Sequence, residues 1–371
     1  MNRFSKSVLS SLVLLACASA MMAQQPLGSF PVGGTAMAIA FNGQTSKIYV
    51  VGGLGNVLTE IDELTRSSTL IPLQNTGSQV ASAQVVVNPI ANAVYVTNVV
   101  GNNIAIVDGV THAVSFIPTA ASPYAMALNL ATNKLYIADF DANMVTVLDT
   151  VKKTTVNIPV GIHPSAIAVN WHTNRIYVAN SNSDTVSVIN GSDNSVATVA
   201  VGLYPSALAV DVNHNKVYVA NTQGNDLTEI SGATNATSNI VVGTYPAHVA
   251  VNGTTGHVYV AFQIPGNIAV FNPSTGITTL VPAGLFENEI RIDEWRNKIY
   301  VADPTGNQLV VIDGATNATT TVAGAGTYLW RIAVNPMTNE VYAANLTSND
   351  ATVFTGAPGK LSTSLLEFLG K

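Results

Sequence analysis

One hexapeptide recurs eight times along this chain of 371 residues, and its spacing constrains the fold more than any other feature. RIYVAN, at residues 175–180, is one copy, and every copy carries a central tyrosine among small or β-branched residues. The spacings between successive tyrosines are 46, 41, 41, 41, 41, 41 and 42 residues. A fixed period near 40 residues is typical of a β-propeller. The eight tyrosines are Tyr49, Tyr95, Tyr136, Tyr177, Tyr218, Tyr259, Tyr300 and Tyr342.

Each repeat reads as four short strands. Residues 165–202 contain SAIAVN, RIYVAN, TVSVIN and VATVAVG, which are rich in Val, Ile and Ala and are separated by turn residues. Asn or Gly precedes seven of the eight tyrosine motifs, as in Asn174, and Ser46 precedes the other. Asn and Gly accept a left-handed backbone at low cost, so this column predicts a hairpin with positive φ. A second column (Asn102, Asn143, Asp184, Asn225, Asn307 and Asn349) predicts another turn.

Units such as PSAIAVNWHTNRIYVANSNSDTVSVING resemble the YVTN-type β-propeller repeat of bacteria and archaea, over residues 28 to about 356. The resemblance implies a propeller in a secreted or surface protein, mostly without a defined activity. Related propellers include lactonases and the haem-binding domain of nitrite reductases, so the fold alone implies no chemistry. The family usually has seven blades. We therefore expect a single all-β propeller of eight four-stranded blades, with seven as the fallback.

The chain start reads as a secretory signal peptide over residues 1–23, because a basic segment precedes an apolar run with small-residue cleavage sites after Ala20 and Ala23. Lipid attachment at Cys17 is the alternative. Cys17 is the only cysteine, so a conventionally cleaved chain would hold no disulfide. We expect an exported protein, whether periplasmic, extracellular or at the cell surface, with no transmembrane segment in the mature chain.

The predicted propeller covers residues 24–357 and leaves a C-terminal tail at 358–371. GSFPVG, at residues 28–33, matches the fourth-strand endings TVAVG and NIPVG of later units. This match predicts that an N-terminal strand completes the last blade, because an open sheet edge would invite aggregation. The apolar tail KLSTSLLEF competes for the same place.

An aromatic arc is predicted at one mouth of the propeller. The residue before the first strand is a ring in five consecutive units, and Trp330 is a further candidate beside this column. Such rings could stack on sugars or flat ligands, or they could pack over the following prolines and cap the blade junctions. The five rings are His163, Tyr204, Tyr245, Phe286 and Tyr328.

A polar cluster is predicted on the innermost strands of the last three units. Three residues after the ring column, where four earlier units have Ala, stand His248, Glu289 and Arg331, and Arg291 follows on the same strand face. Two interpretations remain open. The groups could form a structural salt-bridge network, or they could line a pocket for an anionic or hydroxylated ligand.

Composition narrows the function further. The net charge of −6 and the absence of a basic cluster argue against nucleic acid as a partner. The histidines have no metal-ligand spacing and no cofactor motif is present, so neither a metal nor a cofactor is expected. We expect a non-catalytic binding platform for a protein, carbohydrate or small molecule. The alternatives are a lactonase-like hydrolase, with Glu289 or His248 as base and an arginine stabilising the oxyanion, and a structural cell-surface module.

Overall fold

The computed structural model describes residues 25–53, 56–73, 84–263, 266–284, 289–324 and 326–356. The predicted signal peptide with Cys17, the candidate Phe286 and the C-terminal tail lie outside the described residues. Within the described part, no helix is long and apolar enough to cross a membrane.

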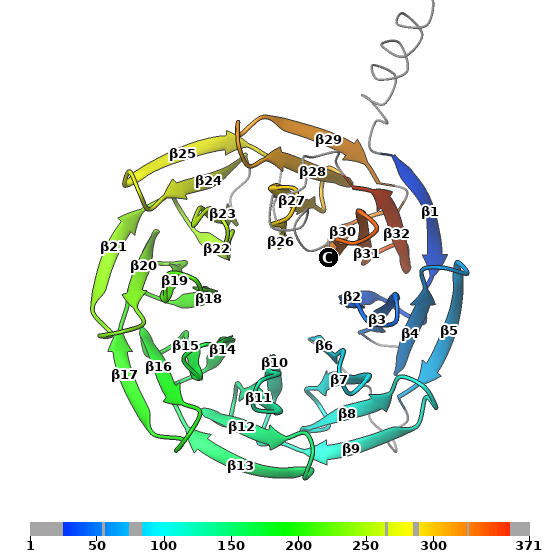
Figure 1. The fold of residues 1–371 in the computed structure, drawn as a ribbon, viewed down its shortest axis with the longest axis horizontal. Coiled ribbons are helices and arrows are strands. Elements are labelled where there is room, and N and C mark those ends of the chain that lie inside the picture. Colours follow the sequence, from blue (N-terminus) through cyan, green and yellow to red (C-terminus); the bar gives the residue numbers. More distant parts are fainter. Residues whose placement is uncertain are drawn as a thin grey trace, which may run out of the picture.

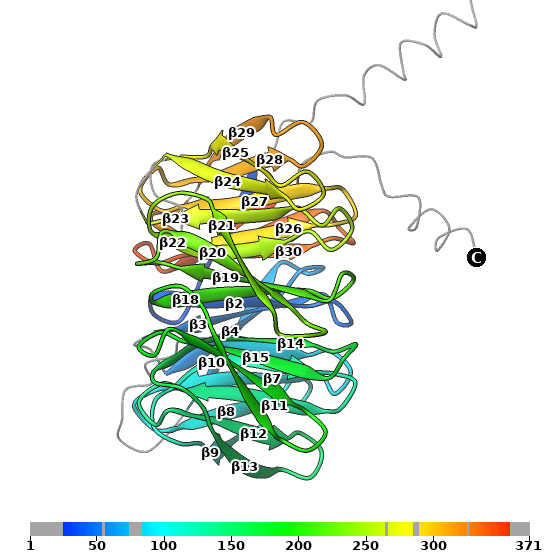
Figure 2. The ribbon, with the colours of Figure 1, turned by 90° about the vertical axis from the view of Figure 1, so that its left-hand side faces the viewer.

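The described chain forms eight antiparallel sheets of four strands each, arranged as blades around a central axis (Figure 1). The predicted count of eight blades is therefore confirmed. The first strand of each blade lies nearest the axis, and Figure 2 shows the ring edge-on.

The blades are numbered in chain order, and the strands of each blade follow one another from the axis outward. Blade 1 contains β2 (Ala36–Asn42), β3 (Lys47–Gly52), β4 (Val57–Asp62) and β5 (Ser67–Pro72). Blade 2 contains β6 (Val85–Asn88), β7 (Ala93–Asn98), β8 (Asn103–Asp108) and β9 (Val114–Pro118). Blade 3 contains β10 (Pro123–Asn129), β11 (Lys134–Asp139), β12 (Met144–Asp149) and β13 (Thr154–Pro159). Blade 4 contains β14 (Pro164–Asn170), β15 (Arg175–Asn180), β16 (Thr185–Asn190) and β17 (Val196–Ala200).

The second half repeats the same plan. Blade 5 contains β18 (Pro205–Asp211), β19 (Lys216–Asn221), β20 (Asp226–Ser231) and β21 (Thr237–Val241). Blade 6 contains β22 (Pro246–Val251), β23 (Val258–Phe262), β24 (Asn267–Asn272) and β25 (Ile277–Pro282). Blade 7 contains β26 (Glu289–Asp293), β27 (Lys298–Asp303), β28 (Gln308–Asp313) and β29 (Thr319–Ala323). Blade 8 contains β30 (Leu329–Asn335), β31 (Glu340–Asn345), β32 (Asp350–Thr355) and β1 (Pro26–Pro31).

The hydrophobic core lies between neighbouring blades. All eight repeat tyrosines are fully buried. Each of the eight buried clusters combines side chains from two adjacent blades, as where Tyr136 and Val147 of blade 3 pack with Ile176 and Val178 of blade 4. A single blade could not bury its apolar faces alone, so the repeats are stable only as a ring.

The turn residues adopt the predicted backbone. Ser46 and the asparagines before the tyrosine motifs have φ between 46° and 60°, and Gly256 has φ of 74°. The six residues of the second turn column also have positive φ, from 48° to 61°. The left-handed geometry that Asn tolerates is therefore why these two columns read Asn so often.

The ring is closed by the N-terminal strand, as predicted. β1 pairs with β32, with Phe30 opposite Ala351 and Pro31 opposite Asp350. The residues after β1 also repeat the internal pattern, because the N–H of Val32 donates to the carbonyl oxygen of Asn349 at 3.1 Å. The fourth-strand place for which the C-terminal tail competed is thus taken by β1.

Candidate functional site

The aromatic column stands where the chain turns into the first strand of each blade. Among its described members, His163, Tyr204, Tyr245 and Tyr328 have φ between 53° and 62°, and Ser122 of blade 3 has φ of 60°. A bulky residue is uncommon in the left-handed region. The fold requires this backbone geometry, but the geometry itself would favour Asn or Gly over a ring.

The preceding blade holds each of these residues in place. The N–H of His163 donates to Asn143 Oδ1 at 2.9 Å, and the N–H of Tyr204 donates to Asp184 Oδ1 at 2.8 Å. The N–H groups of Ser122, Tyr245 and Tyr328 make the same bond to Asn102, Asn225 and Asn307. The second turn column, predicted as turn chemistry, therefore also positions the aromatic column of the next blade.

Two of the rings reach solvent. Tyr204 is 37% exposed and Tyr245 is 43% exposed, although the prolines that follow them, Pro205 and Pro246, are buried. Tyrosine at a rim offers a rigid apolar face together with a hydroxyl that can hydrogen-bond.

The arc extends into blade 3 through two rings that the sequence reasoning missed. Phe140 stacks on His163 with ring centroids 4.4 Å apart and planes 9° apart, and Tyr124 lies 5.8 Å from Phe140. Tyr124 is 48% exposed. A signal was present, because Tyr124 and Trp330 occupy one column in which blades 4 to 6 have Ser or Ala.

Glu289 and Arg291 form a clasp between blades 7 and 8. Arg291 Nη2 lies 2.6 Å from Glu289 Oε1, and the other carboxylate oxygen, Oε2, accepts the N–H of Ile332 at 2.7 Å. Arg291 Nε donates to the carbonyl oxygen of Ile332 at 3.2 Å. Glu289 is buried, whereas 51% of the Arg291 side chain is exposed.

Blade 2 makes the same kind of contact to the next blade with an uncharged side chain. Gln84, in the column of Glu289, accepts the N–H of Met126 in blade 3 through Oε1. In both junctions a long polar side chain receives a backbone N–H from the innermost strand of the next blade. This parallel supports the structural interpretation of Glu289.

Arg331 and His248 make none of the bonds described for Glu289 and Arg291. The Arg331 guanidinium lies 5.3 Å from the centroid of the Trp330 ring, which stacks at 5.8 Å on Tyr328. Although part of His248 reaches solvent, burial and the nearby guanidinium groups of Arg331 and Arg291 lower its pKa to about 3. The imidazole is therefore neutral at pH 7 and can accept or donate a hydrogen bond.

The described part of the chain does not show a general-base pair. Both oxygens of Glu289 are engaged by Arg291 and Ile332, and among the described residues no hydrogen bond joins Glu289 to His248. Among the described residues no ion pair involves Arg331, and its guanidinium lies over the Trp330 ring. No group of three or more His, Asp or Glu residues within the described ranges could hold a metal ion.

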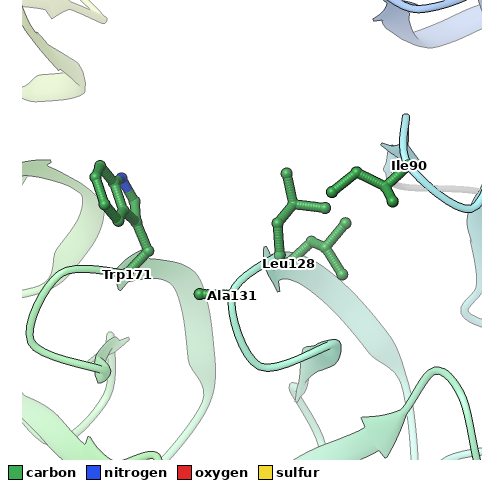
Figure 3. A pocket seen from close by; sticks show the side chains of 5 residues that line it. Ile90, Leu128, Ala131 and Trp171 are labelled. Atoms are coloured by element: carbon green, nitrogen blue, oxygen red, sulfur yellow. The ribbon is translucent and has the colours of Figure 1, made fainter.

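A cavity of about 390 Å³ lies at the opposite end of the axis from this mouth. It is lined by apolar side chains from the first turns and innermost strands of blades 2 to 4 (Figure 3). Trp171 is one wall of it and is 57% exposed.

The comparisons with known proteins establish similarity of fold only. No family model and none of the curated proteins matches the sequence. Kuenenia stuttgartiensis hydrazine synthase is a similar solved structure, with a TM-score of 0.62 and 16% identity over 76% of this chain and 99% of that one. The Dos1 propeller gives a TM-score of 0.76 and 10% identity over 91% of this chain and 97% of that one. The chain is thus an eight-bladed β-propeller of four-stranded blades.

Proposed function

We propose that the protein is an exported, non-catalytic binding platform whose ligand is held at the mouth, against the aromatic arc and beside Arg331. The observation that carries this proposal is that Tyr204 and Tyr245 occupy left-handed backbone positions while their rings remain partly exposed. A left-handed backbone costs a non-glycine residue roughly 1–2 kcal/mol. Asn in the neighbouring turn columns is the less strained choice, so the rings are better explained by contact with a ligand than by the turn.

The chemistry of the mouth favours a ligand that has both a flat face and hydrogen-bonding groups. Tyrosine rings supply stacking area, and the neutral imidazole of His248 and the guanidinium of Arg331 supply polar contacts. A carbohydrate fits these groups, and a protein or other small-molecule ligand uses the same contacts. The sequence resemblance to YVTN-type repeats and the signal-like start support an exported location.

The two alternatives have less support. A lactonase-like hydrolase would need a base, but the Glu289 carboxylate is engaged on both oxygens, and a pKa of about 3 makes the His248 imidazole a weak base. A purely structural module agrees with the Glu289 and Arg291 clasp, but it gives no reason for exposed tyrosines at strained positions.

The decisive experiment exchanges the rings for the residue that the backbone prefers. Tyr204→Asn with Tyr245→Asn should abolish ligand-induced shifts in melting temperature across a panel of neutral and acidic oligosaccharides, lactones and organic acids. The unliganded melting temperature should stay the same or rise by a few degrees, because two strained residues are relieved. Ser122→Asn is the matched control, since it changes the same backbone position without removing a ring.

The proposal fails if the double variant retains the ligand shifts of the parent protein. It also fails if no member of the panel shifts the parent and the double variant melts well below it, because the rings would then serve the packing.

A further inference from the structure

The end of the axis opposite the mouth is built from the turns between the first and second strands, and these turns differ between blades 5 to 7 and blades 2 to 4. In blades 5 to 7, polar bonds join neighbouring turns. Asn213 Nδ2 donates to the carbonyl oxygen of Gly253 at 2.7 Å, and the N–H of Gly253 donates to Glu294 Oε1 at 2.9 Å. The turns of blades 5 to 7 are thus joined to one another by their own polar groups.

Blades 2 to 4 instead expose apolar side chains at the same end. Ile90 is 75% exposed, Leu130 is 39% exposed and Trp171 is 57% exposed. Together with Leu128 and Ala131 they border the cavity of about 390 Å³ (Figure 3). Contiguous apolar surface of this kind usually marks a place that another group covers.

Both ends of the described chain lie at this same end of the axis. Asn335 pairs with Glu340, and Glu340 pairs with Thr355, so the last strand finishes beside the first turn of its blade. The N–H of Thr355 donates to the carbonyl oxygen of Gln25, which places the start of β1 there as well. Residues 357–371 therefore continue the chain from the end that holds the apolar cavity.

The remaining sequence supplies an apolar occupant. Five of the nine residues from 361 to 369 are Leu or Phe, and the closing strand that could have used them is β1 instead. An extended chain covers about 3.3 Å per residue, so residues 357–365 can span roughly 30 Å. That is about twice the width of a four-stranded blade from its innermost to its outermost strand, because neighbouring strands are about 4.8 Å apart. The five apolar residues are Leu361, Leu365, Leu366, Phe368 and Leu369.

We propose that the C-terminal segment 361–369 docks its apolar side chains into the cavity of blades 2 to 4, against Trp171. Docking removes apolar surface of both partners from water. Because the segment is tethered to blade 8, its effective concentration at the cavity is in the millimolar range, so even a weak contact is populated. The docked segment would cover the end opposite the mouth and leave the aromatic arc accessible.

Short-range quenching of a bimane label by tryptophan tests the contact in the full chain. Cys17→Ser removes the only other thiol, and Ser364→Cys carries the bimane label next to two of the proposed contact residues. If half or more of the molecules are docked, Trp171→Phe should raise the bimane emission at least about two-fold. Trp295→Phe, a change in the corresponding turn of blade 7, should leave the emission unchanged.

A charge inserted into the segment provides the second measurement. Leu365→Asp with Leu366→Asp should raise the emission as far as Trp171→Phe does, because carboxylates cannot enter an apolar cavity without cost. Ser362→Asp with Thr363→Asp adds the same charge to polar positions and should have little effect.

Three results would overturn the proposal. The first is an emission that Trp171→Phe leaves unchanged, or that Trp295→Phe raises equally. The second is quenching that disappears on dilution, which would assign the cavity to a second copy of the chain. The third is quenching by Trp171 of a label at Gln24→Cys and none at residue 364, which would assign it to the N-terminal segment.

Discussion

Asp139 is a buried carboxyl in a position where four other blades place an amide. It is fully buried at the end of β11, and burial raises its pKa to about 6. Its Oδ2 accepts the hydroxyl of Thr146 at 2.6 Å, whereas the equivalent Asn180 donates from Nδ2 to the hydroxyl of Ser187 at 3.0 Å. Burial therefore favours the neutral form of Asp139, although the bonds that its Oδ2 accepts from the hydroxyl and N–H of Thr146 favour the ionised form.

The sign of the pH dependence follows from the direction of this shift. The folded-state pKa of about 6 lies above the ordinary Asp value of 3.8, so the native state binds the proton more tightly than the unfolded state. The free energy of unfolding should therefore fall as pH rises from about 4 to about 6, and then level off. At about 1.4 kcal/mol per pKa unit, the ionised carboxylate costs on the order of 2–3 kcal/mol above pH 7.

Asp139→Asn should therefore stabilise the protein by roughly 2–3 kcal/mol at pH 7.5 and by little at pH 4. Urea unfolding at both pH values measures the difference. Asp303→Asn is the matched control, because Asp303 stands in the same column but accepts Gln308 Nε2 at 2.8 Å and the N–H of Gly306 at 2.9 Å. Asp303→Asn should give no such gain in the free energy of unfolding. Equal effects of Asp139→Asn at the two pH values would refute the reasoning.

Three further outcomes are expected. Glu289→Ala should lower the free energy of unfolding by about 1–3 kcal/mol, because the buried N–H of Ile332 loses its acceptor, whereas Glu289→Gln should retain most of it; equal losses in urea melts would contradict this. Glu340→Lys and Arg66→Glu should each lower the free energy of unfolding, and the double variant should recover about 1 kcal/mol of that loss, since the pair is partly exposed. A double-mutant cycle measures this coupling, and purely additive losses would argue against it. Deletion of residues 24–33 should expose the edge of β32 and lower the melting temperature by several degrees or cause aggregation; a variant that melts like the parent would show that another segment closes the ring.

The fold could be predicted from the sequence because its strongest constraints are local and repeated. A left-handed turn restricts its own residue, so Asn174 and its equivalents mark the hairpins without knowledge of the neighbours. The motif of residues 28–33 also carried enough of the fourth-strand pattern to identify the closing strand. These features depend on backbone geometry, and the same geometry recurs in every repeat.

The site could be predicted only in part because its properties depend on contacts between blades. The column of Glu289 showed that charges would meet, but the bond from the N–H of Ile332 depends on how blades 7 and 8 are stacked. Tyr124 and Phe140 join the arc through a ring contact within blade 3 that reaches His163 of blade 4. The strain at the tyrosines was equally hidden, because nothing in a ring's identity reports a positive φ.

The junction between blades 3 and 4 is an example of the polar contact between two neighbouring blades inside the ring. Asn129, at the end of one innermost strand, donates from Nδ2 to Oδ1 of Asn174 in the next blade at 2.9 Å. The residue beside that acceptor is Gly191, where a Cβ would lie 2.3 Å from Asn174 Oδ1. A side chain in place of Gly191 would therefore clash with Asn174 as it is placed, whereas blade 3 accommodates Thr150 beside the equivalent Asn133.

At the junction between blades 8 and 1, both the acceptor Asn and the neighbouring glycine are replaced. Blade 1 has Ser46 in place of the acceptor Asn and Glu63 in place of the glycine, and Asn335 donates to both oxygens of Glu63 at 2.7 Å. The shorter serine leaves room for the longer glutamate, so the hydrogen bond survives with a different acceptor. Beside it, Glu340 stands where five other blades have Lys or Arg, and it pairs with Arg66. The junction that brings the two ends of the propeller together thus differs chemically from internal junctions such as that between blades 3 and 4. This difference disfavours closure between the wrong blades, which a ring of eight near-identical units would otherwise permit.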